Sequence, residues 1–459
     1  MAVLQSSSLP CCLAVVLLLA GCTGLPDQRL GREAYQRGDL DTAERNFRQL
    51  ADLGYVEARL GLADLYVNSG DPAKIQEAKA IYRQLAGQLP RIAARLGRLL
   101  AGSPDASAAD LHEASELLEQ ANADGEAVLL PLTRLYLEHP QRFPTLDIRQ
   151  RITQWRAENR PQAELAQVFL YRSENSQVEH RDEIERICTA ALVDNDSCYV
   201  DLAVIYRQGQ QVDKQQALLE RLGQAVRAGR VSPQRAEAVA RVLCNPELGT
   251  PNVDAARALL EPLAAEYPVL WVSLARLVYD NPGQGSAEQL VGYLDKGRTA
   301  DLARAELLSG RLYLEGKRVI CDPFQAERHL LAASAGGEAS ADFLLGRIYW
   351  QGFLGRVYPD KALRHLLAAA RSGDAKADLT LAHMFNRSRG VLPNPVNAWV
   401  FAQLAVRSAR PEDAEFAALL DTLLTPEQRV EAGRVLRAER DYRAATPGAL
   451  MRAATLQSH

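Results

Sequence analysis

Residues 339–352 read ASADFLLGRIYWQG, and this stretch decides the fold. It contains a Leu-Gly-Arg-Ile-Tyr signature that closes at Tyr349, and its apolar side chains recur with the spacing of one helix face. The small residues Ala341 and Gly346 lie among them and leave room for a neighbouring backbone to approach closely. We therefore expect an α-helix that packs tightly against a second helix.

The same signature recurs along the whole chain. Its strongest copies end at an aromatic residue, namely Tyr66, Tyr136, Tyr171, Tyr206, Tyr313, Tyr349 and Phe385, and weaker copies end at Leu100, Leu243 and Val278. Consecutive end positions are 34 to 37 residues apart. A unit of this length with two apolar-periodic stretches is a helix pair, which buries its apolar face only by stacking on its neighbours. The sequence thus predicts an all-α solenoid of about ten helix pairs, with Gly346 and these aromatic residues in the repeat core.

Helix caps recur in phase with the repeats. Asp322 and Asn394 each precede a proline, which places a capping side chain before a first helical residue. We expect Asp360 to cap the helix that follows it in the same way. The sequence Thr-Pro-Glu-Gln at 425–428 is a capping box, which predicts a last helix that closes the stack.

The best-written copy resembles the Sel1-like branch of the tetratricopeptide superfamily. The matching residues are Ala341, Leu345, Gly346, Tyr349, Gly352, Asp360, Lys361, Ala362, Ala368, Ala369 and Gly373. The copy at residues 33–66 is similar to the parent tetratricopeptide family through Gly38-Asp39, Ala43 and Phe47. The resemblance implies a right-handed superhelix of paired helices.

The amino terminus has the pattern of a lipoprotein signal. Residues 9–20 are mostly apolar but too few to cross a bilayer core of about 30 Å as a helix. They end in Leu-Ala-Gly-Cys, which resembles the bacterial lipobox and implies cleavage before Cys22 and acylation of that residue. The first eight residues depart from the usual pattern because they lack Lys and Arg. The alternative is an ordinary signal peptide with an incidental cysteine.

In lipoproteins of Gram-negative bacteria, a residue other than Asp after the acylated cysteine implies sorting to the outer membrane, and here that residue is Thr23. We therefore expect a lipid-anchored protein that faces the periplasm. The predicted organisation is a signal peptide at 1–21, a lipidated tether at 22–28, a repeat solenoid at 29–424, a C-terminal capping helix at 425–445 and a flexible tail at 446–459.

Charge and motif content argue against nucleic-acid binding and against an enzyme. The 53 basic and 57 acidic residues give a net charge of −4, without the basic excess that binds phosphate backbones. The sequence has no His-Glu-x-x-His motif, no paired Cys-x-x-Cys and no Gly-rich phosphate loop. We expect no catalytic residue, no metal and no cofactor. His329 and His365 lie 36 residues apart, which shared repeat register explains.

Four cysteines remain in the mature chain beyond Cys22. Cys188 and Cys198 flank the turn VDNDS within one repeat. The resemblance to secreted Sel1-like proteins, in which cysteines bridge the helices of a unit, implies a disulfide between them. Cys244 and Cys321 lie two repeats apart, about 20 Å in a helix stack, beyond the Cα separation of about 7 Å that a disulfide tolerates. We expect both to be unpaired.

Three features together resemble a family of outer-membrane lipoproteins that serve alginate secretion: the start CTGLPDQRL at Cys22, the mixed repeats, and the late segment LPNPVNAWVFAQLAV at 392–406. That resemblance implies a periplasmic scaffold without enzymatic activity. Its implied partners are the outer-membrane alginate porin and periplasmic alginate-modifying proteins.

Two other classes stay open. A chaperone or assembly factor for outer-membrane barrels would use the same anchor, with a groove for extended peptide. A polysaccharide-cleaving enzyme would need a converging set of His, Tyr or carboxylate side chains, which the sequence does not mark. Direct contact with polysaccharide also stays open.

Overall fold

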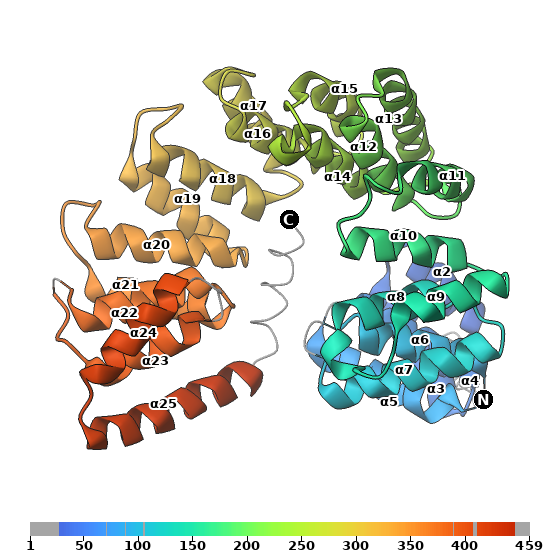
Figure 1. The fold of residues 1–459 in the computed structure, drawn as a ribbon, viewed down its shortest axis with the longest axis horizontal. Helices are drawn as coiled ribbons and strands as arrows, with labels where there is room; N and C mark the ends of the chain where they lie inside the picture. The colour runs from blue at the N-terminus through green and yellow to red at the C-terminus, as the bar shows by residue number, and fades with distance from the viewer. Residues whose placement is uncertain are drawn as a thin grey trace, which may run out of the picture. The chain divides into compact units, whose positions relative to one another are not determined.

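The computed structural model describes residues 27–445 except 70, 88, 104–105, 389 and 407–410. The predicted signal peptide, the lipidation site Cys22, most of the tether and the tail at 446–459 lie outside the described residues. The described part contains 24 α-helices and two short 3-10 helices, and none of its elements is a strand (Figure 1). The all-α prediction is confirmed.

The chain forms two compact units, which divide between Ile148 and Arg149. The sequence predicted one uninterrupted stretch of repeats across this point. The reason for the division is an interruption of the core, because buried side chains stop at Tyr136 and resume only at Ile152. The intervening segment is partly or fully exposed, and its Phe143 packs on Tyr136 of the first unit, with ring centroids 4.9 Å apart.

The first unit is a stack of seven α-helices in its described residues. They are α2 (Gln28–Gln36), α3 (Leu40–Asp52), α4 (Val56–Asn68), α5 (Pro72–Ala86), α6 (Pro90–Ala101), α7 (Ala108–Ala123) and α8 (Leu129–Glu138), followed by the 3-10 helix Pro140–Arg142. Helices that follow one another in the chain, such as α6 and α7, pack against each other. The signature residues Tyr66 and Tyr136 lie near the ends of α4 and α8.

The second unit continues the pattern. Its first eight helices are α9 (Ile148–Ala157), α10 (Ala163–Ser173), α11 (Arg181–Ala191), α12 (Cys198–Gln208), α13 (Val212–Arg227), α14 (Pro233–Cys244), α15 (Val253–Ala264) and α16 (Leu270–Asp280), with a 3-10 helix at Pro246–Leu248. The others are α17 (Ala287–Gly297), α18 (Leu302–Glu315), α19 (Pro323–Ala335), α20 (Ala339–Gln351), α21 (Pro359–Arg371), α22 (Ala375–Asn386), α23 (Pro395–Ala405), α24 (Pro411–Thr422) and α25 (Pro426–Ala445). None of the described helices has both the length and the apolar composition needed to cross a membrane.

Three of the four predicted caps are confirmed. Asp322 accepts hydrogen bonds from two backbone N–H groups of α19, and Asn394 accepts one from α23. Thr425 and Gln428 exchange side-chain and backbone hydrogen bonds as a capping box at the start of α25. The prediction for Asp360 is wrong, because α21 begins at Pro359, two residues earlier than predicted, and the missing N–H of a proline needs no partner. Asp360 instead lies in the first turn, where the helix dipole favours a carboxylate.

Close helix packing depends on glycines in the second helix of several repeats. A Cβ atom on Gly346 of α20 would lie 2.6 Å from Leu366 Cγ of α21. The same relation holds between Gly310 of α18 and Leu330 of α19, at 2.5 Å. Any larger side chain would push the two helices apart. Gly346 therefore has the packing role that its sequence context predicts.

The signature aromatic residues differ in burial. Tyr66, Tyr136, Tyr171, Tyr206 and Tyr349 are buried, whereas Tyr313 and Phe385 are partly exposed and pack against the edge of the core. Phe385 stacks on Phe401 of α23, with ring centroids 5.9 Å apart. Tyr313 is partly exposed for a different reason, because the residues that would cover its ring differ from those around Tyr349.

Candidate functional site

A polar cluster of Glu327 and Lys361 covers the ring of Tyr349, so that this repeat has no opening above its aromatic residue. The Tyr349 hydroxyl donates to Glu327 Oε1 of α19 at 2.5 Å, and Lys361 Nζ of α21 lies 4.8 Å from the ring centroid. Burial and the carboxylate of Glu327 raise the pKa of Tyr349, so the phenol stays protonated and donates. The same cluster recurs as Glu44–Tyr66–Lys74 and Glu185–Tyr206–Lys214. These tyrosines are structural, because each is sealed between three helices.

A buried acid in the second helix joins it to the first helices on both sides. Glu306 of α18 accepts a hydrogen bond from Arg298 Nε at 2.8 Å, and its other oxygen lies 2.5 Å from His329 Nδ1 of α19. One repeat later, Asp342 of α20 accepts from Ser334 at 2.8 Å and lies 2.8 Å from His365 Nδ1 of α21. The two histidines thus occupy equivalent places.

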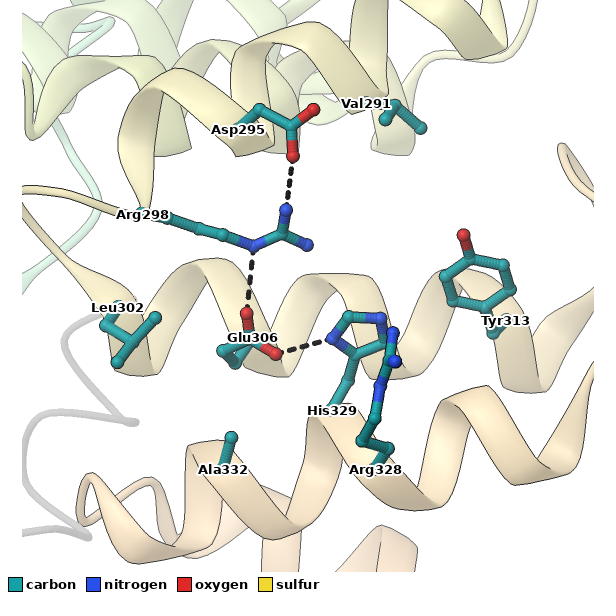
Figure 2. A pocket seen from close by; sticks show the side chains of 9 residues that line it. All are labelled: Val291, Asp295, Arg298, Leu302, Glu306, Tyr313, Arg328, His329 and Ala332. Atoms are coloured by element: carbon teal, nitrogen blue, oxygen red, sulfur yellow. Dashed lines mark hydrogen bonds and ion pairs between the residues drawn. The ribbon is translucent and has the colours of Figure 1, made fainter.

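A hollow of about 520 Å³ opens between α17 and α19, with α18 as its floor (Figure 2). Val291 and Asp295 line it from α17, Glu306 and Tyr313 from α18, and His329 from α19. The Tyr313 and His329 rings are parallel within 3°, with centroids 5.5 Å apart. This volume is within the range of about 300–1,000 Å³ that is typical of small-molecule sites.

The hollow exists because two residues of the covering cluster are replaced. Tyr313 is equivalent to Tyr349, and the positions 36 residues before Glu327 and Lys361 hold Val291 and Gln325. Neither replacement supplies the carboxylate or the ammonium group that seals Tyr349. Within the described parts of the chain, the Tyr313 hydroxyl has no hydrogen-bond partner.

Two arginines reach the hollow and differ in their bonding. Arg298 is fully engaged, with hydrogen bonds to Asp295, Glu306 and Ser309. Arg328 is exposed and, as far as the structure describes the chain, makes no hydrogen bond or ion pair. In Figure 2 its side chain lies beside His329 at the edge of the hollow. The guanidinium group of Arg328 is therefore available to an anionic ligand.

Sequence reasoning missed this hollow because the aromatic signature at Tyr313 is as strong as the others. The sequence does contain a signal for the hollow. The repeat of Tyr349 has Glu327 and Lys361, and the positions 36 residues earlier, in the repeat of Tyr313, hold Val291 and Gln325. Its meaning depends on knowing that these positions, on two different helices, cover the same ring.

A second hollow, of about 430 Å³, is lined by Cys244 of α14 together with residues of α16. Burial raises the pKa of Cys244 to about 11, so its thiol stays protonated and unreactive near neutral pH. Cys321 is exposed and donates a weak hydrogen bond to the Leu314 carbonyl. Neither cysteine is bonded to another in the described structure.

Cys188 of α11 and Cys198 of α12 are buried in one repeat, and their sulfur atoms lie within 4.8 Å of each other and of an Asp201 oxygen. Three such ligand atoms could hold a metal ion. However, both Asp201 oxygens accept hydrogen bonds from Arg172, at 3.1 and 2.6 Å, which leaves two sulfurs. Both cysteines are thiols here, so the disulfide stays a prediction.

We expect peptide mapping without reduction to find Cys188 and Cys198 in one cross-linked fragment when the protein is taken from the cell envelope. The bond would stabilise the fold by about 2 kcal/mol, at the lower end of the usual range, because it closes a short loop. Cys244 and Cys321 provide the internal control, because both should be recovered as free thiols. The exposed Cys321 should react with a thiol label in the folded protein, and Cys244 should react after unfolding. Recovery of Cys188 and Cys198 as free thiols from envelope-derived protein would contradict the prediction.

Comparison with known proteins gives matches along almost the whole chain. The model of the AlgK tetratricopeptide repeat domain matches residues 180–264. The alginate biosynthesis protein AlgK of Pseudomonas syringae pv. tomato is 50% identical over 95% of this chain and 92% of its own length. AlgK of Pseudomonas putida is 55% identical over 86% of this chain and 82% of its own length. A solved structure of a protective antigen from uropathogenic Escherichia coli, with an SLR fold, covers 96% of this chain and 97% of its own, at 18% identity and a TM-score of 0.41.

Proposed function

Because the chain belongs to the AlgK family of alginate biosynthesis proteins, we propose that it is an outer-membrane-anchored periplasmic scaffold of alginate secretion. It holds the outer-membrane alginate porin together with periplasmic alginate-modifying proteins. The observation that carries this proposal is the near full-length match to AlgK proteins by a chain that folds as a repeat solenoid. Solenoids of helix pairs present extended surfaces on which several proteins bind side by side.

The anchor and the start of the solenoid support a position close to the membrane. The helix α2 begins at Gln28, six residues after Cys22. Six extended residues reach at most about 20 Å. If Cys22 carries the lipid, the amino-terminal repeats are therefore held near the membrane surface, where a porin partner also lies.

The polar groups within the repeats support a binding role instead of catalysis. Tyr349 and Glu327 seal a ring, while Glu306 and Asp342 join neighbouring helices. Repeat solenoids of this type are typical of non-enzymatic scaffold proteins. We propose that the protein acts by bringing its partners together, without a reaction of its own.

Co-purification from envelope membranes tests the scaffold. With an affinity tag on the full-length protein, we expect a single outer-membrane porin and a small set of periplasmic alginate-modifying proteins to be enriched. An unrelated outer-membrane lipoprotein with the same tag and the same lipobox is the control, because it reports proteins recovered through the membrane alone. Enrichment of many unrelated barrels would favour a chaperone, and enrichment of none would contradict the scaffold.

A further inference from the structure

We infer that the hollow between α17 and α19 binds a uronate residue of a polysaccharide, a pyranose ring that carries a carboxylate. The inference rests on the proposed function in one respect, since alginate is the uronate polymer that such a scaffold meets. Its structural basis is the pairing of a partly exposed aromatic ring at Tyr313 with a guanidinium at Arg328 that has no partner in the described chain, on the lining of one hollow of about 520 Å³.

Arg328 recognises the carboxylate. A guanidinium group offers a planar pair of N–H donors that matches a carboxylate in two parallel hydrogen bonds. Asp295 and Glu306 bring negative charge to the lining, but Arg298 bonds to both of them, and Glu306 also lies 2.5 Å from His329 Nδ1. Arg298 offsets one of these two negative charges, and the hydrogen bond between Glu306 and His329 turns the second carboxylate toward α19. Arg328 is then the cation of the lining that has no counter-ion in the part of the chain described.

Tyr313 recognises the sugar ring. Its partly exposed ring lines the hollow and stacks on the buried His329, which holds it in place, so the apolar C–H face of a pyranose can lie against Tyr313. The Tyr313 hydroxyl has no protein partner among the described residues, so it can donate to or accept from a sugar hydroxyl. A uronate residue carries a C–H ring face and a carboxylate on one unit, which matches both features of the lining, and for this reason we assign the hollow to polysaccharide instead of a carboxylate side chain of a protein partner.

The next repeat explains why this hollow is special within the solenoid. Arg364 of α21 is equivalent to Arg328, and it is also exposed and without a partner in the described chain. The ring beside it, Tyr349, is only 1% exposed beneath Glu327 and Lys361. Arg364 therefore has the charge of a uronate site without the aromatic surface, which makes it a matched control.

Titration calorimetry of the full-length protein in detergent, with alginate tetrasaccharides, tests the inference. Neutral tetrasaccharides of mannose serve as the comparison ligand. We expect the uronate ligand to bind at least about tenfold more tightly than the neutral one, as expected for a charge-assisted contact. Arg328→Gln should weaken uronate binding by about 10- to 100-fold, and Arg364→Gln should leave it within about twofold, because the equivalent ring of its repeat, Tyr349, is buried.

A second variant closes the hollow. Val291→Glu combined with Gln325→Lys installs the pair that seals Tyr349 one repeat later, so it should abolish uronate binding without lowering the melting temperature. Undetectable uronate binding by the unmodified protein, equal binding of both ligands, or binding that survives both Arg328→Gln and the closed variant would overturn the inference. Loss of a protein partner from Arg328→Gln, without any uronate binding, would assign the hollow to a protein carboxylate and also overturn it.

The scaffold proposal and the uronate-site inference can be contradicted independently of each other. Arg328→Gln should still co-purify with the porin and the periplasmic proteins, because the inference assigns Arg328 to the polysaccharide and not to a protein partner. Uronate binding by a protein that enriches no partner would contradict the scaffold alone. Normal partner enrichment by a protein that binds no uronate would contradict the uronate site alone.

Discussion

Replacing Tyr349 with alanine should lower the free energy of unfolding by about 3–5 kcal/mol, the cost of removing a large aromatic side chain from a packed core. The ring is 1% exposed between α20 and its neighbours, so its loss leaves a cavity. The substitution also removes the donor to Glu327, which is then left partly buried beside Lys361. In a solenoid this loss falls mainly on the adjacent repeats.

Thermal and urea unfolding measure the effect, and hydrogen exchange shows where it falls. Tyr349→Phe, which removes only the hydroxyl, should cost about 1 kcal/mol. Tyr313→Ala is the matched control, since this equivalent ring is already partly exposed and its hydroxyl has no partner among the described residues. Its loss of stability should be smaller than that of Tyr349→Ala. An unchanged melting curve for Tyr349→Ala, or an equal loss at Tyr313, would show that the covering cluster does not stabilise the repeat as described.

Replacing Cys22 with alanine should release a folded protein into the soluble periplasmic fraction and sharply reduce alginate export. The repeats do not depend on this residue, which precedes α2. Anchoring confines the protein and a membrane partner to one surface, and linking two binding events in this way raises overall binding by about 10²- to 10⁴-fold. Without acyl chains that gain is lost.

Membrane fractionation, porin localisation and secreted uronic acid measure the three parts of this expectation. Cys321→Ala is the control, because it removes an exposed thiol within the solenoid and leaves the lipobox intact. Its protein should stay in the outer membrane with normal export. Normal porin placement and normal export by a fully soluble Cys22→Ala protein would count against the anchored scaffold, while leaving room for a soluble binding role.

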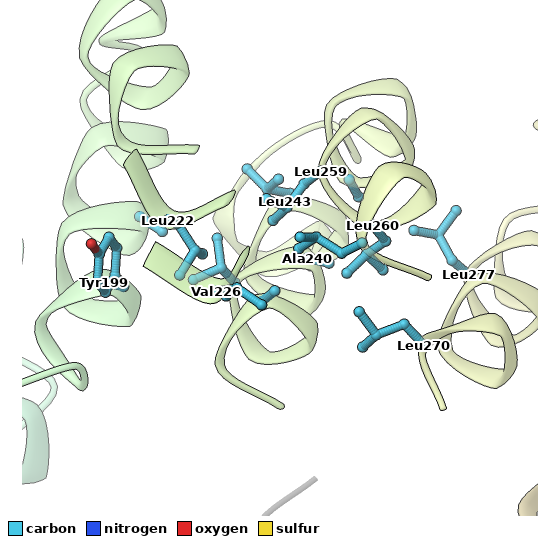
Figure 3. Close-up of a cluster of buried hydrophobic side chains, with 14 of the residues drawn as sticks. Tyr199, Leu222, Val226, Ala240, Leu243, Leu259, Leu260, Leu270 and Leu277 are labelled. Carbon is cyan, nitrogen blue, oxygen red and sulfur yellow. The ribbon is translucent and has the colours of Figure 1, made fainter. Parts of the chain in front are cut away.

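The weak copies of the signature show whether a repeat needs an aromatic residue at its end. Leu243 of α14 and Val278 of α16 stand where stronger copies have an aromatic residue, yet both are completely buried. Figure 3 shows Leu243 beside Leu259 and Leu260, in a cluster that also contains the ring of Tyr199. At its own position in the repeat, Leu243 fills the core with an aliphatic side chain. The helix pair is therefore set by apolar spacing and not by the aromatic residue itself.

The sequence by itself determined the helix pairs, their stacking within each unit and three of their caps, because these depend on residues that are close in the chain. A repeat of 34 to 37 residues has only its neighbours on which to bury an apolar face, so periodicity alone implies the solenoid. The start of α21 is the local exception, where a proline took the first helical position ahead of Asp360. A shift of two residues in a cap, from Asp360 to Tyr358, is within the precision with which local patterns place a helix end.

Only the tertiary structure decided which of the equivalent tyrosines is sealed and which is open. The ring of Tyr349 is covered by Glu327 from the helix before it and Lys361 from the helix after it, and neither relation is visible until the three helices are packed. Burial is a property of all side chains that surround a ring, so the similar signatures at Tyr313 and Tyr349 lead to different exposure. For the same reason, the sequence does not show that Arg328 lies near the Tyr313 and His329 rings. That arrangement follows from the packing of α18 against α19.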